Sequence, residues 1–279
     1  MLVVNTSIFD QKNFISDCKK SSGFTWEGIA SYLGVSRAMA FLYYNSACQL
    51  PFDRYLALCG LVGQSPNISL AVEAKGTMTT INVPRVLDES LAELLGILAG
   101  DGHISAKNYE VNVAGHKFLD KEYHKEHVAL LFFDIFGLSV RFKECLIKKA
   151  RHLRVYSKEL AFYLSNNFGL PLGKKLGHLH IPSMLFDNLV FLKCFLRGLF
   201  DTDGSIYKRR KRDLVVSIIS KDTVFLSEVA SALSLLGFHP SVSGKNLYLY
   251  RHAEVERFFI EIQPVNRRHL DRWEVFRLL

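Results

Sequence analysis

The feature that most constrains this 279-residue chain is an internal repeat. The segment LLGILAGDGHI at residues 94–104 is similar to LRGLFDTDGSI at residues 196–206. The Asp-Gly pairs that begin at Asp101 and Asp203 lie 102 residues apart, and the similarity continues downstream in both copies. Two copies of one unit predict a pseudo-symmetric protein, because a solenoid needs three or more repeats.

Hydrophobic periodicity and turn residues give each copy the order helix, strands, helix, strand, helix. Strands are expected at 109–114 and 214–220, and the helices that follow them at 120–136 and 222–236. The fold class predicted for the chain is α+β, with two pseudo-symmetric αββαββα-type repeats.

Small residues lie four apart on the helix that opens each copy. Gly96 and Gly100 share one stripe of the first helix, and Gly198 and Thr202 hold the equivalent positions in the second. A glycine inside a helix costs about 1 kcal/mol relative to alanine, so a pair of them needs a compensating contact. Because a missing Cβ lets backbones approach, we expect the two helices to pack against each other and form the seam between the halves.

Two acids stand at the ends of these helices. The first helix is expected to begin with a capping box formed by Ser90 and Glu93. Asp101 and Asp203 end the two helices, each before a glycine expected to form a left-handed C-terminal cap. If the helices run side by side, both carboxylates reach the same end of the seam.

That end of the seam is unfavourable for anions. Helix C-termini are partially negative, and two carboxylates about 4 Å apart repel by roughly 4 kcal/mol at an effective dielectric constant of about 20. A divalent cation offsets this repulsion, and carboxylate and carbonyl oxygens are the ligands of Mg²⁺. The alternative is that each Asp-Gly pair marks an ordinary turn, which two equivalent occurrences disfavour.

These segments resemble the LAGLIDADG family of homing endonucleases. Residues 94–102 and 196–204 each fill the nine positions of the family's signature motif, and the resemblance covers residues 88–279. In that family the two motif helices form the interface between two α/β halves, and each half presents a saddle-shaped antiparallel sheet to duplex DNA. The resemblance therefore implies the same architecture here.

In the family, the last acid of each motif binds the catalytic metal. Carried over, Asp101 and Asp203 bind Mg²⁺, with the backbone carbonyls of Gly100 and Thr202 as co-ligands. Many members have a further acid two positions earlier in the motif. Here that place is taken by Ala99 in the first copy and by Asp201 in the second.

The stretch GLPLGKKLGHLHIPSMLF also resembles the family, in which a lysine at this point reaches the active site and helps to organise the attacking water. The matching residue is Lys175, with Lys174 beside it, and an exposed lysine pair on a loop is the alternative. The second copy reads PVNRRHLDRWE, where Arg267, Arg268 or Arg272 stands near the expected lysine. Because arginine does not readily release a proton, the chemistry of the second site stays open.

Contacts to DNA are expected from the strands after each motif, because alternate residues of a strand point to one face of a sheet. A solvated hairpin tip is the alternative for the basic run in the second copy. The predicted DNA-binding residues of the repeats are Lys107, Asn112, His116, Lys117, Lys174, Tyr207, Lys208, Arg209, Arg210, Lys211, Arg212, Ser217, Ser220, Lys221 and Arg268.

Residues 1–65 are predicted to form a small all-α domain, joined by a linker at 66–87 to the first repeat at 88–181 and the second at 182–279. Three helices are expected. They lie at 25–33, 36–44 and 52–60, with Thr25 and Ser36 as N-caps and Gly34 in a turn.

This helical pattern resembles small helix-turn-helix modules. It places Arg37, with Ala38 and Tyr43 or Tyr44, on a helix that faces DNA, and a helical packing unit without a ligand is the alternative. The expected core residues are Ala30, Leu33, Val35 and Leu42.

Composition agrees with a polyanion partner, since 35 Lys and Arg against 27 Asp and Glu give a formal net charge of +8. No apolar run approaches the roughly 20 residues of a membrane span. Five cysteines without metal-ligand spacing favour reduced thiols in the cytoplasm. The chain opens with Met1 and ends in WEVFRLL, without the residues of protein splicing, which favours a free-standing protein, intron-encoded or otherwise, over an intein.

The function expected from the sequence is a monomeric, Mg²⁺-dependent endonuclease that cuts double-stranded DNA at a specific site. The alternative on the same scaffold is a protein that binds nucleic acid without cutting it, either an RNA intron maturase or a transcription regulator. A basic structural protein is a third hypothesis, which leaves the paired acids unexplained.

Overall fold

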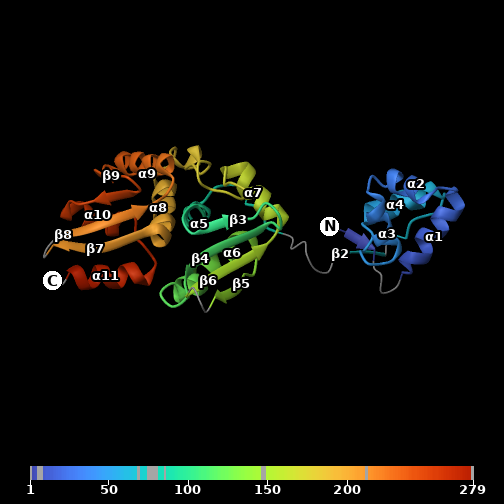
Figure 1. Cartoon of the computed structure of the whole chain (residues 1–279), viewed down its shortest axis with the longest axis horizontal. Coiled ribbons are helices and arrows are strands. Elements are labelled where there is room, and N and C mark those ends of the chain that lie inside the picture. Colours follow the sequence, from blue (N-terminus) through green and yellow to red (C-terminus); the bar gives the residue numbers. More distant parts are fainter. Residues whose placement is uncertain are drawn as a thin grey trace. The chain divides into compact units, whose positions relative to one another are not determined.

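The computed structural model describes residues 2–4, 9–67, 70–73, 81–84, 86–145, 149–210 and 213–277. The chain divides into two compact units, Met1–Met78 and Thr79–Leu279 (Figure 1). Each unit has its own hydrophobic core. Among the described helices, none combines the length and apolar character that crossing a bilayer requires.

The first unit contains four described helices and a short antiparallel ribbon. The helices are α1 (Gln11–Ser22), α2 (Trp26–Tyr32), α3 (Arg37–Tyr44) and α4 (Phe52–Leu61), and the ribbon pairs β1 (Leu2–Val4) with β2 (Ala71–Glu73). The unit is therefore not purely helical, because a strand from the expected linker returns to pair with the N-terminal segment.

The N-caps expected in this unit are confirmed. The Thr25 side chain accepts a hydrogen bond from the Gly28 N–H, and Ser36 accepts one from the Met39 N–H. Gly34 has a φ of 64°, the left-handed conformation that the turn between α2 and α3 requires.

Two expected core and surface positions in α3 are wrong. Leu42, expected in the core, is 41% exposed, and Tyr43, offered as a DNA-facing residue, is 5% exposed. Ala30 and Leu33 are buried as expected. The helix is rotated relative to the expectation, so that Tyr43 packs in the core of this unit. The buried Gln11 donates a hydrogen bond to the Tyr43 carbonyl.

The second unit contains the two repeats. The first repeat comprises α5 (Glu89–Ala99), β3 (Gly102–Ile104), β4 (Glu110–His116), a π-helical segment (Tyr123–Val128) that continues into α6 (Ala129–Phe136), β5 (Arg141–Cys145), β6 (Ala150–Tyr156) and α7 (Lys158–Phe168). The second comprises α8 (Leu189–Asp203), β7 (Gly204–Arg210), β8 (Asp213–Ile219), α9 (Thr223–Leu235), β9 (Ser241–Ser243), β10 (Asn246–Leu249), α10 (His252–Glu261) and α11 (Arg267–Arg277).

The two repeats have the same sheet topology. The strand orders are β3-β4-β6-β5 and β7-β8-β10-β9, with antiparallel pairing throughout. The predicted α+β fold with two αββαββα repeats is therefore correct, with α11 as an additional C-terminal helix. In Figure 1, α5 and α8 lie side by side between the two sheets.

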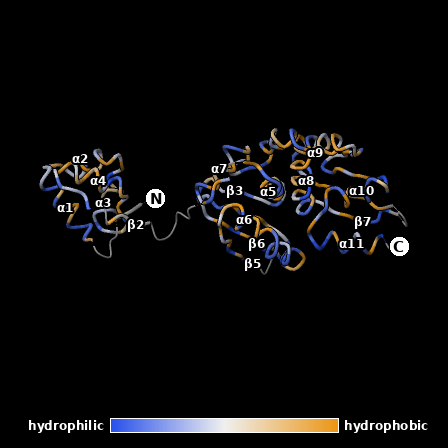
Figure 2. Tube along the Cα trace, turned by 180° about the vertical axis from the view of Figure 1, so that it is seen from behind, coloured by the Kyte–Doolittle hydropathy of each residue, from blue (hydrophilic) through white to orange (hydrophobic). Residues whose placement is uncertain are grey.

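Each sheet has one apolar face and one open face, as a period of two dictates. Val111 and Val113 of β4 and Leu153 of β6 are fully buried beneath the helices, whereas the residues between them are partly exposed. The hydrophobic character of α5 and α6, which contribute to the same core, is clear in Figure 2. The open faces are left for polar side chains.

The predicted seam between α5 and α8 is confirmed, and glycine makes it possible. A Cβ added to Gly96 would lie 1.9 Å from the Phe195 carbonyl oxygen, and one added to Gly198 would lie 2.2 Å from the Glu93 carbonyl oxygen. A Cβ added to Gly100 would lie 2.0 Å from Oγ1 of Thr202. The backbones touch along the stripe of small residues.

The expected start of α5 is wrong. The N-cap is Asp88, whose carboxylate accepts a hydrogen bond from the Leu91 N–H, and Ser90 lies inside the helix. Glu93 does not serve the cap. It is 4% exposed and accepts hydrogen bonds at the seam from Arg197 (3.2 Å) and His127, because the packed helix presents it to the other half of the unit.

The expected left-handed caps at Gly102 and Gly204 are also wrong. Neither residue has a positive φ, and each instead begins a strand. A Cβ on Gly102 would lie 2.4 Å from the Leu98 carbonyl oxygen, and one on Gly204 would lie 2.3 Å from the Phe200 carbonyl oxygen. Glycine is required because each strand leaves its motif helix at close range.

Candidate active site at the end of the helix seam

Asp101 and Asp203 lie at the same end of the α5–α8 seam. Asp203 is the last residue of α8, and Asp101 follows Gly100, the C-cap of α5. A Cβ built on Gly100 would lie 3.5 Å from the carboxyl carbon of Asp203, so the end of one helix abuts the acid of the other. The packing of the small residues therefore brings the two acids together.

Both carboxyl groups are held in an environment that disfavours their charge. The pKa of Asp101 is raised to about 6, chiefly by burial and less by the charge of Asp120, against the opposing charges of Arg268 and Lys175. Burial, followed by the charge of Asp101, raises the pKa of Asp203 to about 7, again opposed by Lys175 and Arg268. The two acids therefore form a pair of partly desolvated carboxyl groups that repel each other when both are charged.

Neither carboxylate has a hydrogen-bond donor that offsets this repulsion. Within the described residues, no donor hydrogen-bonds the side chain of Asp101 or Asp203. The same part of the chain holds no cluster of three or more His, Cys, Asp or Glu arranged around a metal ion. Two desolvated carboxylates beside carbonyl oxygens fit a hard divalent cation, and its remaining ligands would be oxygens from outside the protein.

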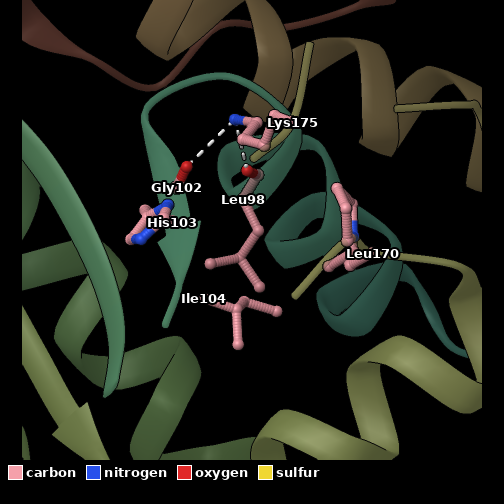
Figure 3. A pocket seen from close by; sticks show the side chains of 7 residues that line it. Leu98, Gly102, His103, Ile104, Leu170 and Lys175 are labelled. Atoms are coloured by element: carbon pink, nitrogen blue, oxygen red, sulfur yellow. Dashed lines mark hydrogen bonds between the residues drawn. The ribbon is translucent and has the colours of Figure 1, made fainter. Parts of the chain in front are cut away.

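Lys175 lies beside both acids. Its ammonium group donates hydrogen bonds to the carbonyl oxygens of Leu98 (3.1 Å), Gly100 (2.6 Å) and Gly102 (3.0 Å), and Figure 3 shows it directed at the first and last of these. Burial lowers the pKa of Lys175, and the charges of Asp203 and Asp101 oppose that shift. The lysine thus braces the backbone on both sides of Asp101.

Arg268 occupies the equivalent place in the second repeat. Its guanidinium group donates to the carbonyl oxygens of Asp201 (3.1 Å) and Thr202 (2.5 Å), the positions that correspond to Ala99 and Gly100 in the first motif. The structure therefore selects Arg268 among the three arginines that the sequence offered. The carbonyls of Gly100 and Thr202, expected as metal co-ligands, already accept these hydrogen bonds, which leaves one lone pair on each oxygen.

Asp201 anchors the loop that carries Arg268. It is fully buried and accepts hydrogen bonds from the N–H groups of Val265 (2.8 Å) and Asn266 (3.1 Å). The pKa of Asp201 is raised to about 7, because burial outweighs the opposing effect of the two backbone hydrogen bonds. Asp201 is therefore engaged in holding the backbone of the loop that carries Arg268.

The sequence reasoning missed Asp120. This residue is 3% exposed and accepts hydrogen bonds from the Asn266 amide (2.9 Å), from Arg268 (3.2 Å) and from the His116 N–H (2.6 Å). Asp120 precedes Asp222 by the 102-residue interval that separates the motif acids. That interval was the signal in the sequence that could have identified it.

The open face of the first sheet is basic. Asn112 of β4 pairs across the strands with Arg154, which in turn pairs with Arg141, and His152 pairs with Lys143. Only Asn112 among these was predicted, although the alternation in β6 could have indicated the others. The side chains on this face with basic or imidazole groups are His103, Arg141, Lys143, His152 and Arg154.

The other sites predicted in the first repeat fall at its edges. Lys107 is exposed in the β3–β4 loop, and Lys174 is exposed next to Lys175. Lys117 forms an ion pair with Glu144 at 3.1 Å. His116 ends β4, where its Nδ1 accepts hydrogen bonds from the following backbone N–H groups.

The basic strand of the second repeat divides between two faces. Tyr207 and Arg209 point to the open face, where the guanidinium group of Arg209 lies over the Tyr250 ring. Lys208 points the other way, and its ammonium group lies over the ring of Phe276 in α11. The open face of this sheet therefore offers fewer basic side chains than the run suggests.

Ser217 is not available as a surface contact, because it is 3% exposed in the centre of the sheet. Ser220 is half-buried and its hydroxyl accepts a hydrogen bond from the Asp222 N–H, whereas Lys221 is exposed. Arg210 ends β7. Lys211 and Arg212 lie outside the described residues.

Comparison with known proteins addresses the second repeat directly. Residues 191–263 match the family model of the LAGLIDADG-like domain. The chain contains a LAGLIDADG-like domain. This domain starts in α8, includes Asp203 and ends after α10, and the first repeat shares its strand order. The resemblance drawn from the motif residues is confirmed.

Individual proteins and solved structures are similar to parts of the chain. The replication factor C small subunit of Thermococcus kodakarensis is 28% identical over 204 residues, which are 68% of this chain and 22% of that protein. A crystal structure of I-DmoI with DNA and Mn is 20% identical, with a TM-score of 0.45, over 62% of this chain and 96% of that one. The I-LtrWI LAGLIDADG homing endonuclease bound to target DNA is 16% identical, with a TM-score of 0.44, over 68% and 89%.

Proposed function

We propose that this protein is a site-specific endonuclease that hydrolyses phosphodiester bonds in double-stranded DNA. The observation that carries the proposal is the pairing of Asp101 and Asp203, one from each half, at one end of the seam with a basic group beside each. One carboxylate and one positively charged side chain from each half match a substrate with two strands.

The proposed metal ligands are the carboxylates of Asp101 and Asp203, with the free lone pairs of the Gly100 and Thr202 carbonyls. A divalent cation, for which we propose Mg²⁺, supplies neutralisation of phosphate charge and activation of water when it is bound. Deprotonation of Asp101 and Asp203, whose pKa values are raised, prepares them to accept it.

Lys175 holds Asp101 in place through the carbonyls on either side of that residue, and its ammonium group donates three hydrogen bonds to the backbone. In the DNA complex we expect Lys175 to exchange one of these bonds for the attacking water and to stabilise negative charge on the phosphate. Arg268 braces Thr202 in the same manner, but it keeps its proton. It contributes charge stabilisation without proton transfer.

DNA binding in this proposal uses the open faces of both sheets. Arg141 and Lys143 contribute positive charge from the first repeat, where Arg154 is paired with Glu110 at 3.4 Å, and Arg209 with Tyr207 contributes from the second. Phosphate contacts of this kind set the position of the duplex, and groove contacts read its sequence. A net charge of +8 supports such a partner.

The first unit is proposed as an additional DNA-binding module. Arg37 stands exposed at the start of α3, within 3.4 Å of Glu27, and its guanidinium group lies over Phe41. Replacement of Arg37 by alanine should weaken DNA affinity and leave the rate of strand cleavage at saturation unchanged. If Arg37→Ala leaves both the affinity for DNA and the choice of cleavage site unchanged, the first unit does not have the proposed DNA-binding role.

The test of the main proposal is a cleavage selection. The full chain is incubated with a plasmid library of random inserts, with Mg²⁺ or with EDTA, and cleaved sites are recovered. We expect Mg²⁺-dependent double-strand breaks at one sequence that Asp101→Asn and Asp203→Asn abolish. Asp187→Asn, the same chemical change at an exposed position of the same unit, is the matched control.

The alternative is a LAGLIDADG-like protein that binds nucleic acid without cutting it, as an intron maturase or a transcription regulator does. Site-specific binding without cleavage at any metal concentration, or acceleration of intron splicing, would favour this alternative over the endonuclease.

A further inference from the structure

The loops that carry Lys175 and Arg268 are each tied to both halves of the second unit. In the first loop, the Gly173 N–H donates to the Ile104 carbonyl of the same repeat at 2.7 Å. On the other side of Lys175, the Gly177 N–H donates to Oδ2 of Asp222 at 2.6 Å. Asp222 belongs to the second repeat. Lys175 is therefore flanked by one hydrogen bond to the first repeat, at Gly173, and one to the second, at Gly177.

The second loop repeats this arrangement with the halves exchanged. Within its own repeat, this loop is held by Asp201, whose carboxylate accepts hydrogen bonds from the Val265 and Asn266 N–H groups. Asp120 of the first repeat holds the same loop from the other side. It accepts a hydrogen bond from the side-chain amide of Asn266 at 2.9 Å and forms an ion pair with Arg268 at 3.2 Å. The loop of each basic residue is therefore held by an acid of the opposite half.

Asp120 and Asp222 are equivalent residues. They lie 102 residues apart, each directly precedes the helix after the second strand of its repeat, and they are 3% and 8% exposed. An N-cap needs one oxygen, which Asp222 supplies to the Phe225 N–H through Oδ1 at 3.2 Å. The second oxygen of Asp222 accepts from the loop of the other half.

Helix capping does not account for either aspartate. Serine or threonine would cap α9 as well as Asp222 does, and the side chain of Asp120 accepts from the His116 N–H of the preceding strand instead of capping a helix. What both residues share is a second acceptor directed across the seam. Buried carboxylates are retained where they are paired, and both are paired with the loop that ends at a proposed active site.

We propose that Asp222 and Asp120 are positioning residues that act across the seam. Asp222 of the second repeat fixes the Lys175 loop, and Asp120 of the first repeat fixes Arg268. This inference rests on the proposed function for its catalytic meaning, while the loop tethering stands on the structure alone. Loss of either acid is expected to impair one active site and to spare the other.

The tethering is tested on the metal-free full chain by amide hydrogen exchange. Asp222→Ser retains a hydroxyl for the α9 cap but has no second oxygen to reach Gly177. We expect exchange at the Gly177 amide to rise by about tenfold or more, since an opened hydrogen bond exposes it. The matched control is Asp88→Ser, because Asp88 caps α5 with one oxygen and uses no other in the described structure.

An unchanged exchange rate at Gly177 in Asp222→Ser overturns the inference, and so does an equal rise in the Asp88→Ser control. If the serine variant fails to fold, Asp222→Asn keeps the shape of the side chain and removes one acceptor. This arm needs no DNA, so it remains decisive if the protein cuts nothing.

The catalytic consequence is tested with a duplex that carries the recovered site and a different label on each strand. Under single-turnover conditions with Mg²⁺, Asp222→Ser is expected to slow the cut of one strand roughly 10- to 100-fold, and Asp120→Asn to slow the other, because small displacements of active-site groups cost that much. Equal slowing of both strands by either variant overturns the crossed assignment. Absence of cleavage by the unaltered protein counts against the proposed function, and hydrogen exchange alone then decides whether the tethers exist.

Discussion

Lys175 and Arg268 bond the equivalent carbonyls of Gly100 and Thr202 at the ends of α5 and α8, but among the described residues only Arg268 has a carboxylate partner. Arg268 forms an ion pair with Asp120 at 3.2 Å, whereas Lys175 forms no ion pair within the described residues. The basic group of the second half is permanently charged and neutralised by a fixed acid. The basic group of the first half is held by backbone carbonyls and feels the charges of the two motif acids.

This asymmetry predicts that the two DNA strands are cut at unequal rates, with the strand served by Lys175 cut faster. Lys175→Met should slow that strand by roughly 10²- to 10⁴-fold, the range for loss of a positioned acid–base group. Strand-resolved single-turnover kinetics measures it. Lys174→Met is the matched control, because Lys174 is exposed next to Lys175 and bonds none of the seam carbonyls. Similar rates for the two variants would contradict the role of Lys175.

The seam predicts a sharp penalty for a single methyl group. Gly198→Ala places a Cβ 2.2 Å from the Glu93 carbonyl oxygen and 2.8 Å from the Ile97 nitrogen, so the helices must separate. We expect a loss of about 3 kcal/mol or more in the free energy of unfolding of the second unit. Urea denaturation followed by the fluorescence of Trp273 in a Trp26→Phe background reports on that unit, because the chain has two tryptophans and one lies in each unit.

The control for the seam substitution is Gly60→Ala in α4 of the first unit, where no atom lies within 4 Å of the added Cβ, and its stability is followed by the fluorescence of Trp26 in a Trp273→Phe background. A helical glycine without a close neighbour should gain about 0.5–1 kcal/mol on replacement by alanine. Equal effects of the two substitutions would mean that glycine serves the seam only through helix propensity.

The buried His124 predicts acid sensitivity of the second unit. Burial lowers the pKa of His124 to about 4, although Asp120 raises it, and its Nδ1 atom has no hydrogen-bond partner among the described residues. Between pH 6.5 and pH 4 the unfolded chain binds this proton and the folded chain does not, so stability falls as the pH falls through that window. At pH 5 the loss from this residue is about 2 kcal/mol relative to pH 7.

His124→Phe removes the titrating group without removing a hydrogen bond from Nδ1. The stability of the unaltered protein relative to this variant should therefore drop by about 2 kcal/mol between pH 7 and pH 5, as measured by urea denaturation at each pH. A constant difference across that range would show that the imidazole is protonated or solvated in the folded state.

Metal binding should weaken in acid because protons compete for the same carboxylates. The pKa values of about 6 for Asp101 and about 7 for Asp203 place both groups largely in the anionic form at pH 8 and largely protonated at pH 5.5. We expect Mn²⁺ affinity, measured by titration calorimetry on the full chain, to fall at least tenfold over that interval. Asp203→Asn should remove most of the binding, and an affinity independent of pH would place the ion elsewhere.

Several features followed from the sequence because they depend on local chemistry or on the repeat itself. The stripe of Gly96 and Gly198 predicted the seam, since a missing Cβ permits close backbone approach in any context. The caps at Thr25 and Ser36 followed from side-chain oxygens placed before an apolar period. The error at Gly102 arose because close packing, and not local conformational preference, decided that position. The start of α5 was misplaced because Asp88, two residues before Ser90, is also a good cap, while Glu93 is held at the seam.

By itself, then, the sequence determined that two similar halves meet through their small-faced helices and bring Asp101 and Asp203 to one end, because each of these features is written in short-range spacing and repetition. Only the tertiary structure decided which arginine replaces the lysine and which acids hold the loops. Asp120 and Arg268 are 148 residues apart. Their contact exists because the packed seam places the turn after β4 in the first repeat beside the start of α11 in the second. No local pattern encodes the partner of a side chain across such an interface.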